Sequence, residues 1–258
     1  MKIIELFNSL SISKKLSLLF ILALALRFSS YFTHPYIHSD SVTYLSINYH
    51  DSIGDIQTGL ELHRQLPPAI LYFMRGFSNT GIDVELGYRV TGVIFYSLAL
   101  FSLFYIARFF ISENAALFAT FCYVCHPKAV DYSHAVLRET IAIPFMLFGL
   151  SFLLMSIEKK KYNIAAASGL CIAFSYMARL EYGVAFILGL IVFVLFILIK
   201  KNIFTIDRKR YFLSLGILLS SMISLLVIVN IEMKSYDSYW DPFAYRKVKG
   251  FVMRTFSE

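Results

Sequence analysis

The chain has 258 residues, of which 58% are hydrophobic, 17% aromatic and only 16% charged. Together with a mean hydropathy of +0.65, this composition excludes an ordinary soluble globular domain and indicates an integral membrane protein in contact with membrane lipid. The formal net charge of +7 at pH 7 does not indicate nucleic-acid binding, because the basic residues cluster in short runs between apolar segments, where they report membrane orientation.

The first apolar run covers residues 16–32, about the length that a membrane-spanning helix requires. Lys14 and Lys15 directly precede it, so the positive-inside rule places the N-terminus in the cytoplasm. The run is long and no convincing cleavage site follows it, so we expect an uncleaved signal anchor. The chain should then emerge on the external, periplasmic face of the cytoplasmic (inner) membrane.

The polar stretch that follows this first span reads His38-Ser39-Asp40-Ser41-Val42-Thr43-Tyr44. Helical spacing puts Asp40 and Tyr44 on one face of a short helix lying along the membrane surface. A carboxylate at that position stays ionised at little cost, so Asp40 is our candidate for the catalytic carboxylate. The alternative is that Ser39 or Asp40 simply caps the start of a helix.

Residues 35–82 form the expected first external loop. Its apolar piece, residues 67–77, is too short to cross about 30 Å of hydrocarbon. We therefore expect interfacial helices in this loop, one of them beginning at Pro67-Pro68, because proline is tolerated in the first turn of a helix and not in its interior.

Six further apolar runs predict spans that alternate in direction. Two further basic runs fall on the side that the N-terminal lysines mark as cytoplasmic: Glu158-Lys159-Lys160-Lys161 and Lys200-Lys201. The expected fold is therefore all-α: a polytopic membrane helix bundle of about seven transmembrane helices, forming a single domain over 1–258 with an external tail at about 230–258. The six runs are 84–110, 111–125, 138–157, 164–177, 182–199 and 211–229.

This topology gathers charged residues at the external ends of the spans. Each one alone could be a helix end whose charge reaches water. Several cations together with carboxylates on one face instead indicate a site, and a phosphate is the group most often held in this way, since arginine binds two phosphate oxygens at once. A lipid-linked phosphate suits the membrane setting. The gathered residues are Asp40, Arg64, Lys128, Arg138, Glu139, Arg179 and Glu181.

The order of motifs resembles the polytopic membrane glycosyltransferases of the GT-C superfamily, in particular the aminoarabinose and protein-mannose transferases. The resemblance covers residues 16 to about 198. The motifs that carry it are Asp40 with Tyr44, His63-Arg64-Gln65-Leu66-Pro67-Pro68, Leu86-Gly87-Tyr88-Arg89-Val90, Tyr105-Ile106-Ala107-Arg108, Tyr132-Ser133-His134-Ala135-Val136-Leu137-Arg138-Glu139 and Met177-Ala178-Arg179-Leu180-Glu181-Tyr182-Gly183.

The resemblance implies transfer of a sugar from a polyprenyl-phosphate donor to a lipid, glycan or protein acceptor of the cell envelope. Asp40 would be the catalytic base or bind the acceptor, and the carboxylates would orient the arginines or the sugar. The remaining residues would bind the substrate: Tyr44, Arg64, Lys128, Arg138, Glu139, Arg179 and Glu181. Family members usually carry further spans or an external domain, so we also expect a minimal enzyme, a fragment or a chain that needs a partner subunit.

The alternative function is non-enzymatic: a transporter, a flippase or an assembly subunit that binds a lipid-phosphate headgroup. A transporter should place ionisable groups near the middle of the membrane. Only Arg27 lies well inside a predicted span, and we expect it to reach water at the outer end. A divalent cation is possible, with Asp40, His38 and His126 as ligands, although their spacing forms no recognisable metal site.

Overall fold

The computed structural model describes residues 10–33, 39–54, 67–179, 181–183, 186–187 and 208–234, with side chains of the last range described for 212–229. Regular structure in these ranges is entirely α-helical, which confirms the expected all-α class. The helices are α2 (Ile12–Thr33), α3 (Ser39–Ser52), α5 (Pro68–Thr80), α6 (Val84–Phe110), α7 (Glu113–Cys125), α8 (Pro127–Ser133), α9 (Arg138–Lys159), α10 (Tyr162–Ala178) and α12 (Arg208–Lys234).

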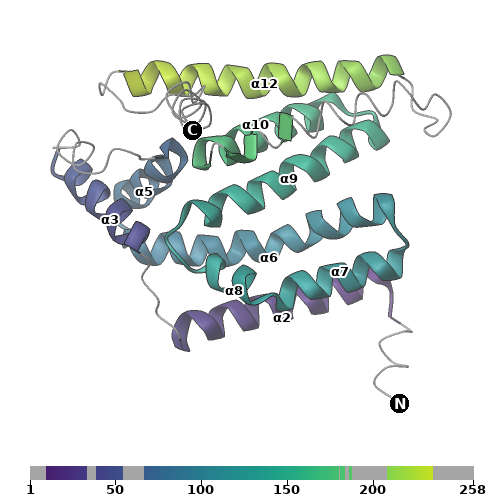
Figure 1. Ribbon diagram of the computed structural model, residues 1–258, viewed down its shortest axis with the longest axis horizontal. Helices are drawn as coiled ribbons and strands as arrows, with labels where there is room; N and C mark the ends of the chain where they lie inside the picture. Colours follow the sequence, from purple (N-terminus) through teal and green to yellow (C-terminus); the bar gives the residue numbers. More distant parts are fainter. Residues whose placement is uncertain are drawn as a thin grey trace, which may run out of the picture.

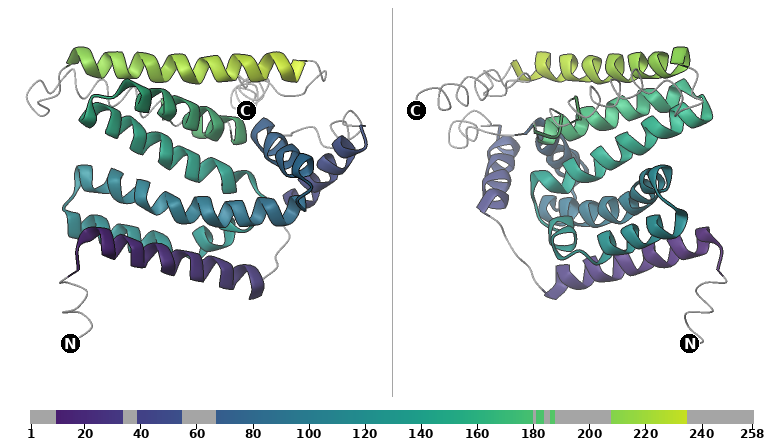
Figure 2. Two further views of the ribbon diagram at one scale, coloured as in Figure 1. Left: turned by 180° about the vertical axis from the view of Figure 1, so that it is seen from behind. Right: turned by 45° about the vertical axis from the view of Figure 1, so that its right-hand side comes forward.

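The long helices lie side by side in the order α2, α6, α9, α10 and α12, with α7 against α2 and α6 (Figure 1). The two further views show the same layering (Figure 2). Helices α3, α5 and α8 gather at one end of this bundle, together with the starts of α6 and α9 and the end of α10. We call this the α3 end.

Four helices are long and apolar enough to cross a membrane: residues 12–33, 84–110, 138–159 and 212–229. The chain is therefore a multi-pass membrane protein. Helix α10 is apolar but shorter, at 17 residues, and the 13 residues of α7 rise only about 20 Å. The count of seven spans stays a prediction, because most of the expected span at 182–199 lies outside the described residues.

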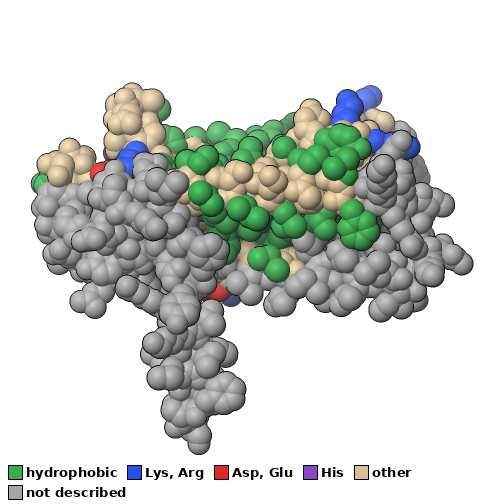
Figure 3. Space-filling view, turned by 90° about the horizontal axis from the view of Figure 1, so that it is seen from above, with side chains coloured by type: hydrophobic (Ala, Val, Ile, Leu, Met, Phe, Trp, Pro, Cys, Tyr) green, Lys and Arg blue, Asp and Glu red, His purple; other side chains and the backbone are tan. Residues whose placement is uncertain are grey.

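The surface between the two ends of the bundle is apolar. Seen from the α12 side, hydrophobic side chains cover most of the described surface, whereas Lys and Arg side chains lie near the ends (Figure 3). On α12, Ile223 is 56% exposed and Ile228 is 61% exposed. An exposed apolar band of this kind fits contact with lipid.

Helix α5 shows why the first loop contains helices. Pro67 precedes it in an extended conformation, and Pro68 stands at its first position, where a missing N–H costs nothing. Gly81 ends the helix with a φ of 72°, a left-handed conformation that favours glycine. The predicted helix start at Pro67-Pro68 is confirmed, and the location of α5 along the membrane surface stays a prediction.

A shared apolar core packs α3 and α5 onto the helix ends. Tyr44 and Ile47 of α3 lie in the same cluster as Leu71 and Met74 of α5. The cluster continues into α6, α9 and α10 through Tyr88, Ile141, Ala142, Met177 and Ala178. Burial of apolar surface therefore holds the helix that carries Asp40 against the bundle.

One expectation about the spans was wrong. The Arg27 side chain does not reach water but is fully buried, because α6 and α7 pack against this face of α2. Its Nη1 donates to the carbonyl of Ala23 at 3.2 Å, and its guanidinium carbon lies 5.6 Å from the centre of the Tyr123 ring. Aromatic and backbone oxygen contacts thus replace only part of the hydration of this cation, since Nε and Nη2 have no hydrogen-bond partner among the described residues.

Candidate functional site

The segment that joins α8 to α9, residues 134–137, is buried although it is not helical. Buried carbonyl groups need hydrogen-bond partners, and here side chains from three helices supply them. Four side chains donate hydrogen bonds to backbone carbonyl oxygens of the segment: Ser41 to Val136 (3.0 Å), Tyr88 to Leu137 (2.8 Å), Arg89 to His134 (3.1 Å) and Thr140 to Ala135 (2.7 Å). This segment fixes the position at which α9 begins.

Helix α6 approaches the segment closely. A Cβ atom on Gly92 would lie 2.3 Å from the Ser133 carbonyl oxygen, so glycine is required at this contact. Glu85 holds the Arg89 guanidinium through Nη2 at 2.7 Å, while Nη1 of Arg89 reaches the His134 carbonyl. Arg89 belongs to the sequence motif at residues 86–90 but was assigned no role from the sequence. The feature that could have pointed to it is a cation in the first turns of a predicted span.

Tyr44 and Asp40 lie on α3, which confirms the predicted short helix. The Tyr44 side chain is 4% exposed, whereas Asp40 is exposed in the first turn. Burial raises the pKa of Tyr44 to about 12, so its hydroxyl group stays protonated at neutral pH. Four charged groups act on this hydroxyl: Arg138, Asp40, Glu139 and Arg179. These charged residues, far apart in the sequence, thus lie at the same end of the bundle as Tyr44.

Arg179 follows the last residue of α10 and forms an ion pair with Glu139 in the first turn of α9. Its Nε lies 3.6 Å from a carboxylate oxygen of Glu181, and its guanidinium carbon lies 5.8 Å from the centre of the Tyr182 ring. Both acids that we expected to orient the arginines therefore contact Arg179. Its side chain remains 32% exposed, so an incoming anion can still reach it.

Arg138 is the first residue of α9 and is half-buried. Its Nε is buried and has no hydrogen-bond partner among the described residues. A buried guanidinium N–H without an acceptor is costly, and an anion bound at the α3 end would remove that cost. Arg138 therefore has unused capacity for a ligand.

The remaining predicted residues lie apart or outside the described ranges. Arg64 and His38 fall in residues that the structure does not describe. Lys128 is exposed on α8, and within the described chain it makes no hydrogen bond or ion pair with the residues around Tyr44. The described residues also contain no group of three or more His, Cys, Asp or Glu side chains that could hold a metal ion.

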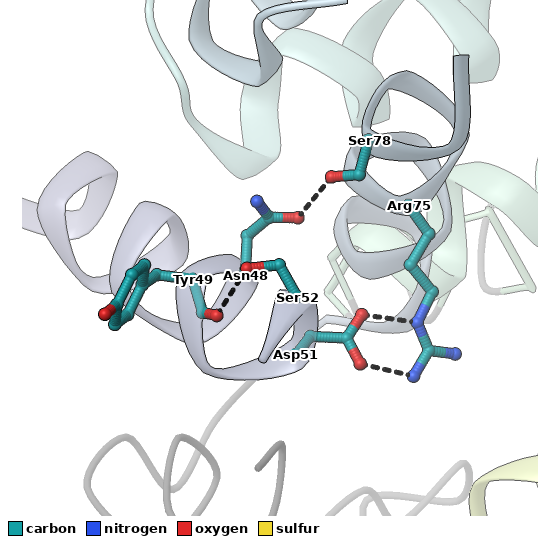
Figure 4. Close-up of polar contacts among 6 residues, drawn as sticks. All are labelled: Asn48, Tyr49, Asp51, Ser52, Arg75 and Ser78. Carbon is teal, nitrogen blue, oxygen red and sulfur yellow. Dashed lines mark hydrogen bonds and ion pairs between the residues drawn. The ribbon is translucent and has the colours of Figure 1, made fainter. Parts of the chain in front are cut away.

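A second polar contact ties α3 to α5 (Figure 4). Arg75 donates from Nε and Nη2 to the two carboxylate oxygens of Asp51 at 2.7 and 2.9 Å. Ser78 of α5 also donates to Asn48 of α3 at 3.4 Å. Sequence reasoning missed this pair, because two charged residues 24 positions apart on different helices give no local pattern.

Comparison with known protein families identifies the chain. The family of dolichyl-phosphate-mannose-protein mannosyltransferases matches residues 65–229, well over half of the sequence. The chain belongs to this family. It is a membrane glycosyltransferase of the GT-C kind, which confirms the resemblance seen in the sequence.

The family match covers only part of the site. Arg138, Glu139 and Arg179 lie inside the matched residues 65–229. Asp40 and Tyr44 precede the matched residues. The packing of α3 on the bundle is what connects those two residues to the matched region. Comparisons with curated proteins and with solved structures gave no match.

Proposed function

We propose that this chain transfers a sugar from a polyprenyl-phosphate donor to an acceptor on the external face of the cytoplasmic membrane. The observation that carries the proposal is that Asp40, Arg138 and Arg179 lie at the same end of the bundle, the α3 end, where all three act electrostatically on the buried Tyr44 hydroxyl group. An exposed acid at the same end of the bundle as two arginines supplies a proton acceptor and a binding place for a phosphate. A glycosyl transfer from a lipid-linked phosphate requires this combination.

Arg138 and Arg179 are the proposed phosphate ligands. They stand at the ends of two neighbouring helices, so both guanidinium groups can face one bound anion. Arg138 has a buried N–H without a described acceptor, and Arg179 is partly exposed. Arginine can bind two phosphate oxygens through its planar fork. Arg64 and Lys128 are proposed as further cations that meet the donor.

Asp40 is the proposed general base. As the acceptor attacks, its hydroxyl proton passes to the Asp40 carboxylate while the acceptor oxygen bonds to the anomeric carbon of the sugar. The bond between that carbon and the phosphate oxygen breaks, and the electron pair leaves with the polyprenyl phosphate. The arginines stabilise the charge that develops on this leaving group. Tyr44, which keeps its proton, can donate a hydrogen bond to the substrate.

A non-enzymatic function in moving or holding lipid phosphates is the second candidate. Arg27, fully buried inside a span, is the observation that favours it, because buried ionisable groups often mark transport paths. Membership of a glycosyltransferase family weighs against this candidate. The two functions separate experimentally: only the enzyme releases free polyprenyl phosphate from a polyprenyl-phosphate sugar in the presence of an acceptor.

Donor binding to purified protein tests the proposed phosphate site. Arg138→Lys and Arg179→Lys keep the charge but lose the fork, so each should weaken binding of a polyprenyl-phosphate sugar about tenfold without loss of folding. Arg108→Lys is the matched control, since Arg108 is an exposed cation at the opposite end of α6. Unchanged donor binding in both site variants would show that Arg138 and Arg179 do not bind the donor phosphate.

A further inference from the structure

Ser41 directly follows Asp40 on α3, and its side chain is fully buried. Its hydroxyl group donates to the carbonyl oxygen of Val136 at 3.0 Å, across 95 positions of sequence. Val136 stands two residues before Arg138. This hydrogen bond therefore joins the residue next to the proposed base to the backbone just before a proposed phosphate ligand.

The acceptor side of this contact is held firmly. The neighbouring carbonyl groups of His134, Ala135 and Leu137 accept hydrogen bonds from α6 and α9. The Val136 side chain itself is fully buried in the core that also contains Tyr44. Because α6 and α9 already hold this segment in place, the hydrogen bond from Ser41 to Val136 positions α3 and not the segment.

The far end of α3 is held separately. Asp51, near the last residue of this helix, is bound by Arg75 of α5 through two hydrogen bonds (Figure 4). Loss of the Ser41 contact would loosen the first turn of α3, while this attachment and the buried Tyr44 and Ile47 still hold the rest of the helix. The first turn is the part that carries Asp40, so its carboxylate would move relative to the arginines.

We propose that Ser41 is a positioning residue for the glycosyl transfer: its hydrogen bond to Val136 sets the place of Asp40 relative to Arg138. This inference rests on the proposed function of Asp40. Proton transfer in the transition state depends steeply on geometry, and a displacement of about 1 Å can cost on the order of 100-fold in rate. The main proposed donor ligands, Arg138 and Arg179, stand at the ends of α9 and α10 and not on α3, so donor binding should be insensitive to this contact.

The test compares Ser41→Ala with Ser168→Ala. Ser168 is also fully buried, and its hydroxyl group donates to the Gly149 carbonyl at 2.6 Å between α10 and α9, away from the α3 end. Both variants lose one buried hydrogen bond from a serine side chain to a backbone carbonyl distant in sequence. Ser41→Ala should lower kcat about 10- to 100-fold with an unchanged KM and Kd for the donor, whereas Ser168→Ala should keep its kcat. Ser41→Cys, which retains a weaker donor, should recover part of the rate.

A distance measurement keeps the inference testable apart from activity. Spin labels at Val42, which is 59% exposed on α3, and at Asp131, which is exposed on α8, report where α3 lies relative to the fixed segment. Ser41→Ala should broaden or shift this distance distribution, and Ser168→Ala should not.

An unchanged distribution, or a kcat in Ser41→Ala equal to that of Ser168→Ala, would overturn the positioning role. Failure of the wild-type protein to transfer sugar from any polyprenyl-phosphate donor would instead overturn the proposed function. In that case the distance measurement still decides whether Ser41 places α3.

Discussion

The ion pair between Arg179 and Glu139 joins the end of α10 to the first turn of α9 across 40 positions of sequence. Glu139 is 16% exposed and Arg179 is 32% exposed. A mostly buried carboxylate thus holds the guanidinium group, which remains partly exposed. A donor phosphate would meet an arginine whose direction is already fixed.

The first prediction concerns this orientation. Glu139→Ala should raise the donor Kd about tenfold, because Arg179 loses a charged hydrogen bond and keeps only its contacts with Glu181 and the Tyr182 ring, so more of its order must be gained on binding. Glu139→Gln keeps an oxygen that can accept the bond and should bind the donor nearly as well as the wild type. Donor titration of both variants checks this. Equal affinity of Glu139→Ala and the wild type would show that Glu139 does not orient Arg179.

The second prediction is a pH dependence that follows from the buried Tyr44. Burial raises its pKa to about 12, whereas in the unfolded chain the phenol ionises near pH 10. The resulting stabilisation is complete below about pH 10 and is lost as the pH rises towards 12. The wild-type Tm should therefore fall more steeply above pH 10 than that of Tyr44→Phe.

The control for this measurement is Tyr49→Phe on the same helix, since the Tyr49 side chain is 62% exposed. Thermal unfolding in detergent between pH 8 and 11.5 gives the three slopes. If Tyr44→Phe follows the wild-type slope, then burial of Tyr44 does not control its ionisation.

The third prediction concerns the contact between Arg75 and Asp51. The pair is bidentate and mostly buried, with side-chain exposures of 22% and 16%. A double-mutant cycle with Arg75→Met and Asp51→Asn should give a coupling free energy of roughly 0.5–3 kcal/mol in unfolding. A coupling near zero would mean that the apolar core alone holds α3 against α5.

The fourth prediction tests topology. Helix α9 has 22 residues, which rise about 33 Å, and it separates the Arg138 end from Lys160. In a cysteine-free background, a cysteine at position 160 should label only from the cytoplasm and one at position 40 only from outside. If both positions label from the same side, then Asp40 and Lys160 do not lie on opposite faces of the membrane and the predicted topology is wrong.

Helix positions were predictable where the apolar pattern was continuous. The span at residues 84–110 has the predicted limits, because Asp83 accepts a hydrogen bond from the Leu86 N–H at 2.7 Å and so caps an unbroken apolar run. Charged residues at the ends of such runs also pointed to Arg138, Glu139 and Arg179. Their convergence follows from helices that alternate in direction.

Contacts that depend on packing between distant segments were not predictable. Ser41 is an ordinary polar residue in the sequence, and its role depends on meeting the Val136 carbonyl from another part of the chain. Arg27 was expected to reach water because its span alone gave no sign that α6 and α7 would cover it. Hydrogen bonds to backbone carbonyls leave no pattern of residue types to recognise.

The central claim is that Asp40 is the base of a glycosyl transfer, and its most direct test is the transfer rate of Asp40→Asn. The matched control is Glu113→Gln, another exposed acid in the first turn of a helix, on α7 at the opposite end of the bundle. Glu61→Gln and Asp55→Asn test the two acids of the first loop that are the likeliest rivals of Asp40. The rate of release of polyprenyl phosphate should fall about 100- to 10,000-fold in Asp40→Asn alone, with donor binding unchanged. Transfer by Asp40→Asn at near the wild-type rate would contradict the account.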